Sequence, residues 1–177
     1  MKNTFLLHAL PEVLEFEGSQ FTDNSNDAGG PTRYGITQTD YNVHLKASGL
    51  PWQSVEFITM QQVDNIYYNM YWSPIHGDDL PFPIDWITFD AGVNMGIQTA
   101  INMLEQAVNF PEDSSITPAL LNAIKSDCST LVGTHALKEK ELSERLNRYN
   151  DIVAQHANDQ EFLQGWINRV NILNQVA

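Results

Sequence analysis

Apolar residues recur at helical spacing along most of the chain. Phe5, Ala9, Val13 and Phe16 stand three or four positions apart, which is the pattern of one apolar helix face and predicts a helix over residues 3–17. The same spacing predicts further helices over residues 37–47, 59–72, 84–96, 97–109, 118–132, 134–156 and 159–174. The sequence therefore predicts a mostly α protein.

Two of these helices carry clear start signals. Thr59 is followed three residues later by Gln62, the pattern of a capping box. Thr117 precedes Pro118, which suits the first position of a helix because proline needs no hydrogen bond to its nitrogen there. Both signals place helix starts where the apolar pattern begins.

Residues 84–96 are apolar on several faces, which predicts a buried central helix. Asp90 and Asn94 interrupt it and lie on one face, since they are four positions apart. Buried polar groups need partners. We expect this face to form hydrogen bonds to the glycine-rich segment at residues 18–35. For Asn94, the alternative is a position in the wall of a substrate cleft.

Residues 18–35 predict a loop or a small hairpin, because glycine, proline, serine, asparagine and aspartate dominate there. Long irregular segments in compact domains usually serve function. This loop is therefore the first place to look for chemistry.

The charge excludes several classes of protein. Nine Lys and Arg stand against 22 Asp and Glu, a formal net charge of -13, which is incompatible with a broad nucleic-acid-binding face. No apolar run reaches the length of about 18 residues that a membrane span requires. The single Cys128 excludes an intrachain disulfide. The acidity is uneven: residues 1–124 hold three bases against fifteen acids, and residues 125–177 hold six against seven.

Glu17 is the candidate acid of the loop region. It ends the first predicted helix between Phe16 and Phe21, where partial burial favours a carboxyl that can donate a proton to a glycosidic oxygen. Asp27 could stabilise developing positive charge or orient water, and Thr32 could hold that water. The same residue types also serve as helix caps and turn formers, so the pattern alone leaves both interpretations open.

Residues 14–21 and 27–37 resemble the signature of glycoside hydrolase family 108, which contains phage endolysins and bacterial muramidases. The resemblance continues at residues 66–72, 89–96, 104–108, 116–118 and 165–170. The chain departs from the family pattern in three places: Ser19 replaces a glycine, Gln20 is inserted before the aromatic residue, and Ser114 replaces the glycine of a turn.

The resemblance implies a lysozyme-like single-domain helical fold, with the glycine-rich loop or hairpin beside the active site. It implies a catalytic lobe at residues 1–96 and a helical peptidoglycan-binding region packed on it at residues 97–177. It makes Glu17 the general acid. The other expected site residues are Asp27 and Thr32 as catalytic assistants, and Tyr34, Tyr71, Trp72 and Asn94 as substrate contacts.

The activity implied is that of an N-acetylmuramidase, which hydrolyses the β-1,4 bond between N-acetylmuramic acid and N-acetylglucosamine in peptidoglycan. We expect a monomer that lyses bacterial cells as a phage endolysin, with no metal or cofactor and with glycan strands as its partner. No cleavage site follows residues 1–14, so we expect no signal peptide. Synthesis in the cytoplasm would then precede holin-assisted release, injection or secretion to the cell wall.

Two alternatives share these residues. Ser19 and Gln20 would also suit a non-catalytic peptidoglycan-binding or virion structural protein. An effector muramidase delivered between bacteria is the other alternative, and the acidic chain would suit a basic immunity protein. Because peptidoglycan is itself anionic, we expect the near-neutral stretch after residue 125 to be the less repulsive side of approach.

Overall fold

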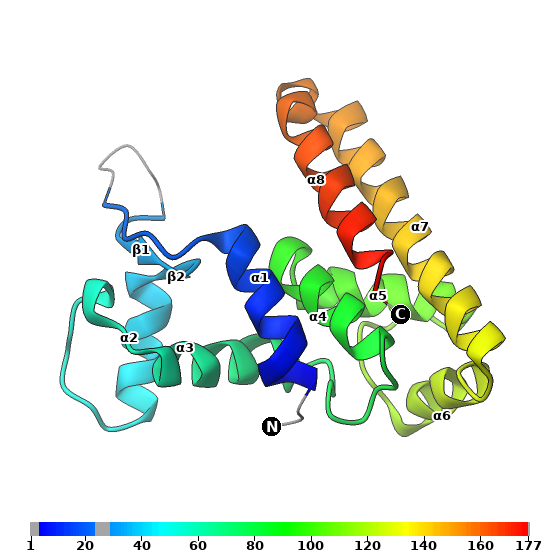
Figure 1. Cartoon of the computed structure of the whole chain (residues 1–177), viewed down its shortest axis with the longest axis horizontal. Helices are drawn as coiled ribbons and strands as arrows, with labels where there is room; N and C mark the ends of the chain where they lie inside the picture. Colours follow the sequence, from blue (N-terminus) through cyan, green and yellow to red (C-terminus); the bar gives the residue numbers. More distant parts are fainter. Residues whose placement is uncertain (1–3, 24–28, 177) are drawn as a thin grey trace. The chain divides into compact units, whose positions relative to one another are not determined.

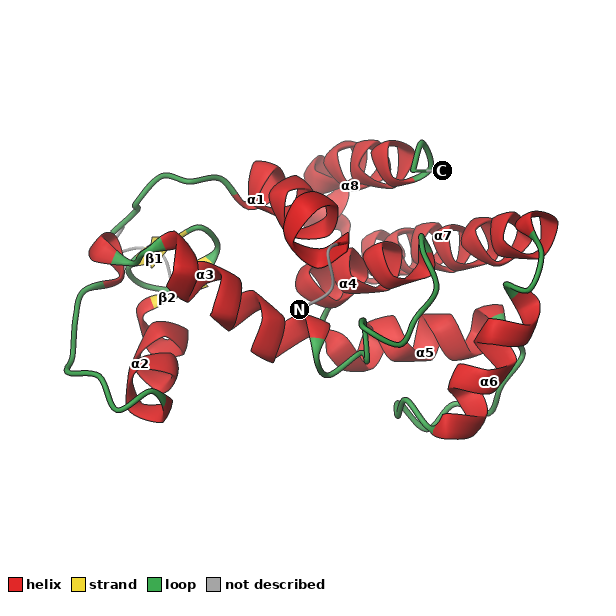
Figure 2. Ribbon diagram, turned by 60° about the horizontal axis from the view of Figure 1, so that its bottom comes forward, coloured by secondary structure: helices red, strands yellow, loops and turns green. Residues whose placement is uncertain are grey.

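The structure is a computed structural model and describes residues 4–23 and 29–176. The chain divides into two compact units, with the boundary between Ser73 and Pro74. Helices make up most of both the units, and a two-stranded sheet lies in the first (Figures 1 and 2). The predicted mostly α, lysozyme-like fold class is confirmed.

The first unit contains short helices and a hairpin. Its elements are η1 (Phe5–Ala9), α1 (Leu10–Glu17), β1 (Thr32–Arg33), β2 (Ile36–Thr37), α2 (Gln38–Ala47), η2 (Val55–Phe57), α3 (Met60–Tyr67) and η3 (Tyr68–Trp72). The predicted capping box is present, since the Thr59 hydroxyl accepts from the Gln62 backbone and the Gln62 side chain accepts from the Thr59 backbone. The local sequence therefore determines where α3 begins.

Aromatic residues form part of the core of the first unit. The Phe5 ring lies 5.5 Å from the Tyr68 ring in an edge-on contact and 5.1 Å from the Trp72 ring. These contacts pack η1 against η3, which continues α3 as a π-helical turn. They hold the start of the α1 segment in place.

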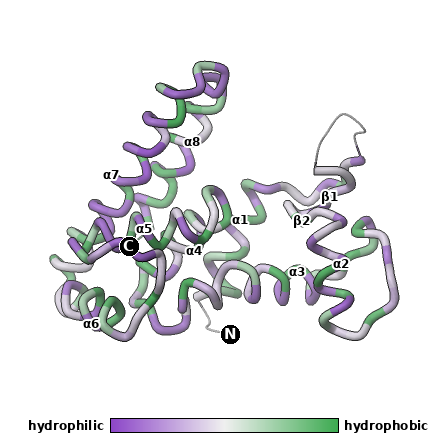
Figure 3. Tube along the Cα trace, turned by 180° about the vertical axis from the view of Figure 1, so that it is seen from behind, coloured by the Kyte–Doolittle hydropathy of each residue, from purple (hydrophilic) through white to green (hydrophobic). Residues whose placement is uncertain are grey.

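The second unit is a set of longer helices. Its elements are α4 (Ile84–Met95), α5 (Ile97–Ala107), α6 (Pro118–Asp127), α7 (Leu131–Gln155), η4 (Ala157–Asp159) and α8 (Gln160–Leu173). Helix α4 packs on α5 and α7, and α7 and α8 run side by side as a hairpin (Figure 1). Hydrophilic and hydrophobic positions alternate along α7, as expected of a helix with one face in the core (Figure 3).

The prediction that α4 is a buried central helix is confirmed. Its residues from Ile84 to Gly92 are buried except Trp86, and Ile87 contacts a cluster made by α7 and α8. The buried partners in that cluster are Leu142, Tyr149, Val170 and Leu173. Because α4 packs on helices that follow it, the boundary between the two compact units lies at residue 73. The boundary expected at residue 96, between a catalytic lobe and a peptidoglycan-binding region, stays a prediction.

The helix predicted over residues 118–132 is shorter than expected. It ends at Asp127, and Thr130 starts a new helix because its hydroxyl accepts from the backbone N–H of Gly133 at 3.0 Å. The turn before α6 forms although serine replaces glycine there. Ser114 adopts a positive φ of 58°, and the buried Glu105 carboxylate accepts from its backbone N–H at 3.2 Å.

The part of the chain that the structure describes contains no helix long and apolar enough to cross a membrane. It also contains no group of three or more His, Cys, Asp or Glu side chains arranged to hold a metal ion.

Burial of Glu141 on α7 is expected to make the free energy of unfolding depend on pH. The side chain is 1% exposed, and its Oε1 accepts from the Thr88 hydroxyl at 2.7 Å. Burial raises the pKa of Glu141 to about 8 from 4.5, against the opposing effects of Thr88 and the Arg145 charge. Between these two pH values the unfolded chain loses a proton that the folded chain keeps, so the free energy of unfolding falls as the pH rises, by roughly 1.4 kcal/mol per unit at most.

We therefore expect Glu141→Gln to remove this slope while keeping the Thr88 bond. Urea unfolding of both proteins between pH 4 and 9 measures it. The stability advantage of the variant over the wild type should grow from about pH 4.5 to 8 and then level off. A difference that is constant over this range would contradict the prediction.

Candidate functional site

Glu17 lies at the C-terminal end of α1, and its side chain is half-buried. The helix stops there because Gly18 adopts a φ of 79°, a conformation that favours glycine, while its N–H still bonds to the Leu14 carbonyl. Glu17 is thus the last helical residue before the chain turns away. Helical hydrogen bonds restrain its backbone only on the N-terminal side.

The turn of the hairpin packs against Glu17. Strands β1 and β2 are antiparallel and are joined by Tyr34 and Gly35, with φ values of 53° and 69°. A Cβ atom on Gly35 would lie 3.1 Å from the Glu17 Cβ and 2.8 Å from the Tyr67 hydroxyl. The Tyr67 hydroxyl donates to the Tyr34 carbonyl at 2.8 Å. Glycine at position 35 therefore permits both the turn and its close approach to Glu17.

Arg33 ties the chain after Glu17 to the hairpin. Its Nε donates to the Ser19 carbonyl at 3.4 Å, and Nη1 donates to the Glu56 carbonyl of η2. The guanidinium also lies over the Tyr34 ring, 5.2 Å from its centre. These contacts restrain the backbone at Ser19 despite the departure from the family pattern there.

Tyr71 shares an electrostatic environment with Glu17. The side chain is half-buried on η3, and its ring centre lies 5.6 Å from that of Tyr67. Burial raises the pKa of Tyr71, and the negative charges of Asp40 and Glu17 raise it further. The phenol therefore keeps its proton at neutral pH and can donate a hydrogen bond.

Asp40 is a member of this site that the sequence did not reveal. Its carboxylate accepts from the Thr37 hydroxyl at 2.7 Å, while its N–H donates to the same hydroxyl oxygen at 3.2 Å. This is helix capping at the start of α2. The folding of α2 beside α3 and η3 brings the Asp40 charge near Tyr71.

Thr32, Asp27 and Trp72 are the other residues of the first unit that were expected at the site. Thr32 lies on β1, and its hydroxyl donates to the Gly30 carbonyl at 2.9 Å. Asp27 falls outside the described residues. Trp72 is 0% exposed and packs on Phe5, so the expectation that it contacts substrate is corrected to a core role. Full burial leaves no ring face for a sugar.

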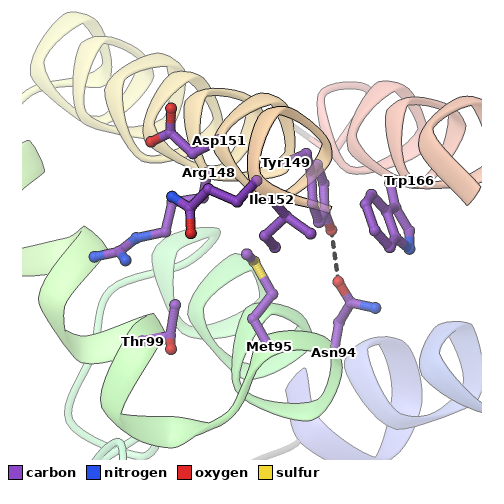
Figure 4. Close-up of a pocket in the computed structure, with 9 residues that line it drawn as sticks. Asn94, Met95, Thr99, Arg148, Tyr149, Asp151, Ile152 and Trp166 are labelled. Atoms are coloured by element: carbon purple, nitrogen blue, oxygen red, sulfur yellow. Dashed lines mark hydrogen bonds between the residues drawn. The ribbon is translucent and has the colours of Figure 1, made fainter. Parts of the chain in front are cut away.

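Asn94 belongs to the second unit and lines a pocket of about 350 Å³ (Figure 4). Its Oδ1 accepts from the Tyr149 hydroxyl at 2.6 Å and from Arg145 at 3.2 Å. Thr99 and Arg148 lie on one side of the pocket, and Tyr149 and Trp166 on the other (Figure 4). The pocket therefore combines polar and aromatic side chains.

Asp90 has partners other than the glycine-rich loop. Its carboxylate accepts from the Arg169 Nε at 3.0 Å and lies 2.6 Å from the Arg145 guanidinium. All three side chains are buried. The expected anchoring role is thus retained, but the partners are arginines of α7 and α8, which corrects the expectation.

Comparisons with known proteins match both parts of the chain. Residues 10–96 match the Glycosyl hydrolase 108 family model, and residues 97–171 match the model named Predicted Peptidoglycan domain. No curated protein matches the chain significantly.

Among solved structures, the fold is similar to that of Brucella abortus SagA. The two are 27% identical with a TM-score of 0.75, and the match covers 98% of this chain and 93% of that chain. A match over nearly the whole of both chains includes both compact units of this chain. The chain therefore belongs to the glycosyl hydrolase 108 family, and it is a peptidoglycan hydrolase of mostly α, lysozyme-like fold.

Proposed function

We propose that this protein is an N-acetylmuramidase with Glu17 as its general acid. The observation that carries the proposal is the packing of the Glu17 side-chain stem against the hairpin turn at Gly35, together with the effect of the Glu17 and Asp40 charges on Tyr71. Lysozyme-like glycosidases use a carboxylic acid in a structured, partly desolvated site to protonate the leaving oxygen.

In the proposed reaction, Glu17 transfers its proton to the glycosidic oxygen as the bond to the anomeric carbon of N-acetylmuramic acid breaks. Water adds to that carbon, and the proton that it releases returns to Glu17 directly or through solvent, so the acid is regenerated. Asp27 is our candidate for stabilising the developing positive charge, and Thr32 for positioning the water. Tyr71 is our candidate for a phenolic hydrogen-bond donor to the substrate, because its raised pKa keeps it protonated.

We propose Tyr34, Tyr71 and Asn94 as contacts to the glycan strand. The Tyr34 and Tyr71 side chains are half-buried, so each presents some ring surface to solvent. Aromatic faces suit the apolar faces of sugar rings, and an amide suits hydroxyl and acetamido groups. In the biological setting, we propose that the protein acts on the bacterial cell wall in phage-mediated lysis.

The products of digestion test the bond assigned. We expect purified peptidoglycan to yield soluble muropeptides with N-acetylmuramic acid at the reducing end, because cleavage frees that anomeric carbon to water. Borohydride reduction followed by mass analysis identifies the terminal sugar. Reducing ends of N-acetylglucosamine would show a glucosaminidase, and 1,6-anhydro ends a lytic transglycosylase. Either result would contradict the proposal, as would binding to the wall without release of muropeptides.

A further inference from the structure

Trp52 is an exposed aromatic residue of the first unit. It is 72% exposed, whereas Trp72 is fully buried. Within the described residues, its indole forms no aromatic pair and no hydrogen bond. Tryptophan is usually largely buried in folded proteins, because its ring carries a large apolar surface. The Trp52 ring is therefore available to a ligand.

The backbone on both sides of Trp52 is held in place. The residue lies in the loop between α2 and η2, which runs along the outside of the first unit (Figure 1). Before it, the Leu50 N–H donates to the Leu45 carbonyl at 2.9 Å. After it, the Gln53 carbonyl accepts from the Gln38 side chain at 3.0 Å. The loop therefore presents Trp52 on an ordered backbone, which lowers the entropic cost of binding a ligand.

Trp52 lines a pocket of about 250 Å³ together with side chains of α2 and of the loop. The other residues that line this Trp52 pocket are Asn42, Leu45, Lys46 and Leu50. The Asn42 Oδ1 accepts from the Gln38 Nε2 at 2.9 Å, so the Nδ2 group of Asn42 remains as a donor. The pocket therefore combines an aromatic ring and aliphatic surface with an amide donor and an ammonium group.

Lys46 is a cation without a partner among the described residues of the first unit. Residues 1–73 contain three Lys and Arg against eight Asp and Glu. Arg33 bonds to backbone carbonyls, whereas Lys46 forms no hydrogen bond or ion pair within the described residues. Asp40 lies on the other face of α2, where it lines a different cavity. The Trp52 pocket is therefore a local positive site in an acidic unit.

We propose that the Trp52 pocket is a second glycan-binding site, apart from Glu17, which takes an N-acetylated sugar ring of peptidoglycan on Trp52 and a stem-peptide carboxylate of the same strand beside Lys46. The apolar face of a sugar suits an aromatic ring, and an acetamido oxygen suits the Asn42 donor. Different groups of the strand contact the ring and the ammonium, so no single group has to reach both. The proposal rests on the peptidoglycan substrate and not on Glu17 as the acid. The site holds the enzyme on an insoluble polymer between cleavage events.

The indole signal of Trp52 tests the site directly. The chain has four tryptophans, so proton–nitrogen NMR of the full chain carrying Glu17→Gln gives four indole signals, and Trp52→Phe identifies one of them. One probe is chitotetraose, an uncharged β-1,4 chain of N-acetylglucosamine, and the other is a peptide-bearing tetrasaccharide of peptidoglycan. We expect both probes to shift the Trp52 signal. Lys46→Gln should weaken binding of the peptide-bearing probe about two- to fivefold and leave chitotetraose unaffected, because an exposed ion pair is lost.

Phe57→Ala is the matched control for removal of the ring. Phe57 is 60% exposed in the same unit but does not line the Trp52 pocket. In co-sedimentation with insoluble cell walls, Trp52→Ala should lower the affinity of the Glu17→Gln protein at least about threefold, because the stacked ring is lost. Phe57→Ala should leave this affinity unchanged. Thermal unfolding of each variant establishes that the fold is retained.

The outcomes separate the glycan site from the catalytic proposal. A Trp52 signal that neither probe shifts would overturn the inference. An equal loss for both probes with Lys46→Gln would also overturn it, because the cation would then not recognise a carboxylate, and so would an equal loss of wall binding for Trp52→Ala and Phe57→Ala. If the wild-type protein yields products other than those of a muramidase while the Trp52 signal still responds, the muramidase assignment fails and the glycan site stands.

Discussion

Replacing Glu17 with glutamine is expected to abolish the release of muropeptides from purified cell walls while leaving the protein folded. Glutamine keeps the size of the side chain and its packing against Gly35 but has no proton of suitable acidity to transfer. General acid catalysis contributes about 10²- to 10⁴-fold, so the rate of reducing-end formation should fall by at least about 10²-fold. Chromatographic quantification of soluble muropeptides over time measures this rate.

Glu15→Gln is the matched control for that experiment. Glu15 lies on the same helix two positions earlier, is exposed, and undergoes the same change of charge. We expect its activity to stay within about twofold of the wild type, because residues two positions apart on a helix point to different faces. Undiminished clearing of cell walls by Glu17→Gln would remove Glu17 from the mechanism.

Asp90→Asn is expected to have the largest effect on stability. The change keeps the shape of the side chain but removes the buried negative charge that contacts the guanidinium groups of both Arg145 and Arg169. Removing one partner of a buried ionic cluster typically costs about 3–5 kcal/mol of unfolding free energy. Urea unfolding followed by circular dichroism should show a midpoint far below that of the wild type, with an unchanged slope.

The control for the cluster is Asp151→Asn, which removes an exposed carboxylate from α7. We expect its unfolding free energy to stay within about 0.5 kcal/mol of the wild-type value. An equally small change for Asp90→Asn would mean that the second unit does not depend on the cluster. The triple replacement of Asp90, Arg145 and Arg169 by apolar residues should be less harmful than Asp90→Asn alone, because it leaves no unpaired charge.

Local sequence signals predicted most of the helices. The capping box at Thr59 and the Thr117–Pro118 pair each lie at the start of a helix in the structure. The end of α6 was placed too late, because the apolar pattern continues past Asp127 although Thr130 starts another helix. Hydrophobic spacing reports which face of a segment is buried, but it does not show a break between consecutive helices.

The sequence did not predict which residues from distant segments contact each other. That Asp90 needs a partner followed from its place in an apolar helix, whereas the choice of Arg145 and Arg169 depends on how α7 and α8 dock. Asp40 carried no sequence signal of a role at the site, because its effect on Tyr71 arises only from packing. For Trp72, composition could not distinguish a buried aromatic ring from an exposed one.

The arginine pair on Asp90 also has a consequence for biosynthesis. Asp90 and Arg169 are 79 residues apart, so the ribosome completes α4 long before it reaches the second guanidinium. At about 5–20 residues per second, roughly 4–16 s pass between the two. Throughout this interval the nascent chain holds an apolar helix and a carboxylate that the later helices have yet to cover. Completion of the buried ionic cluster therefore waits until α8 has been synthesised, and slow synthesis of α8 lengthens the period of exposure to aggregation.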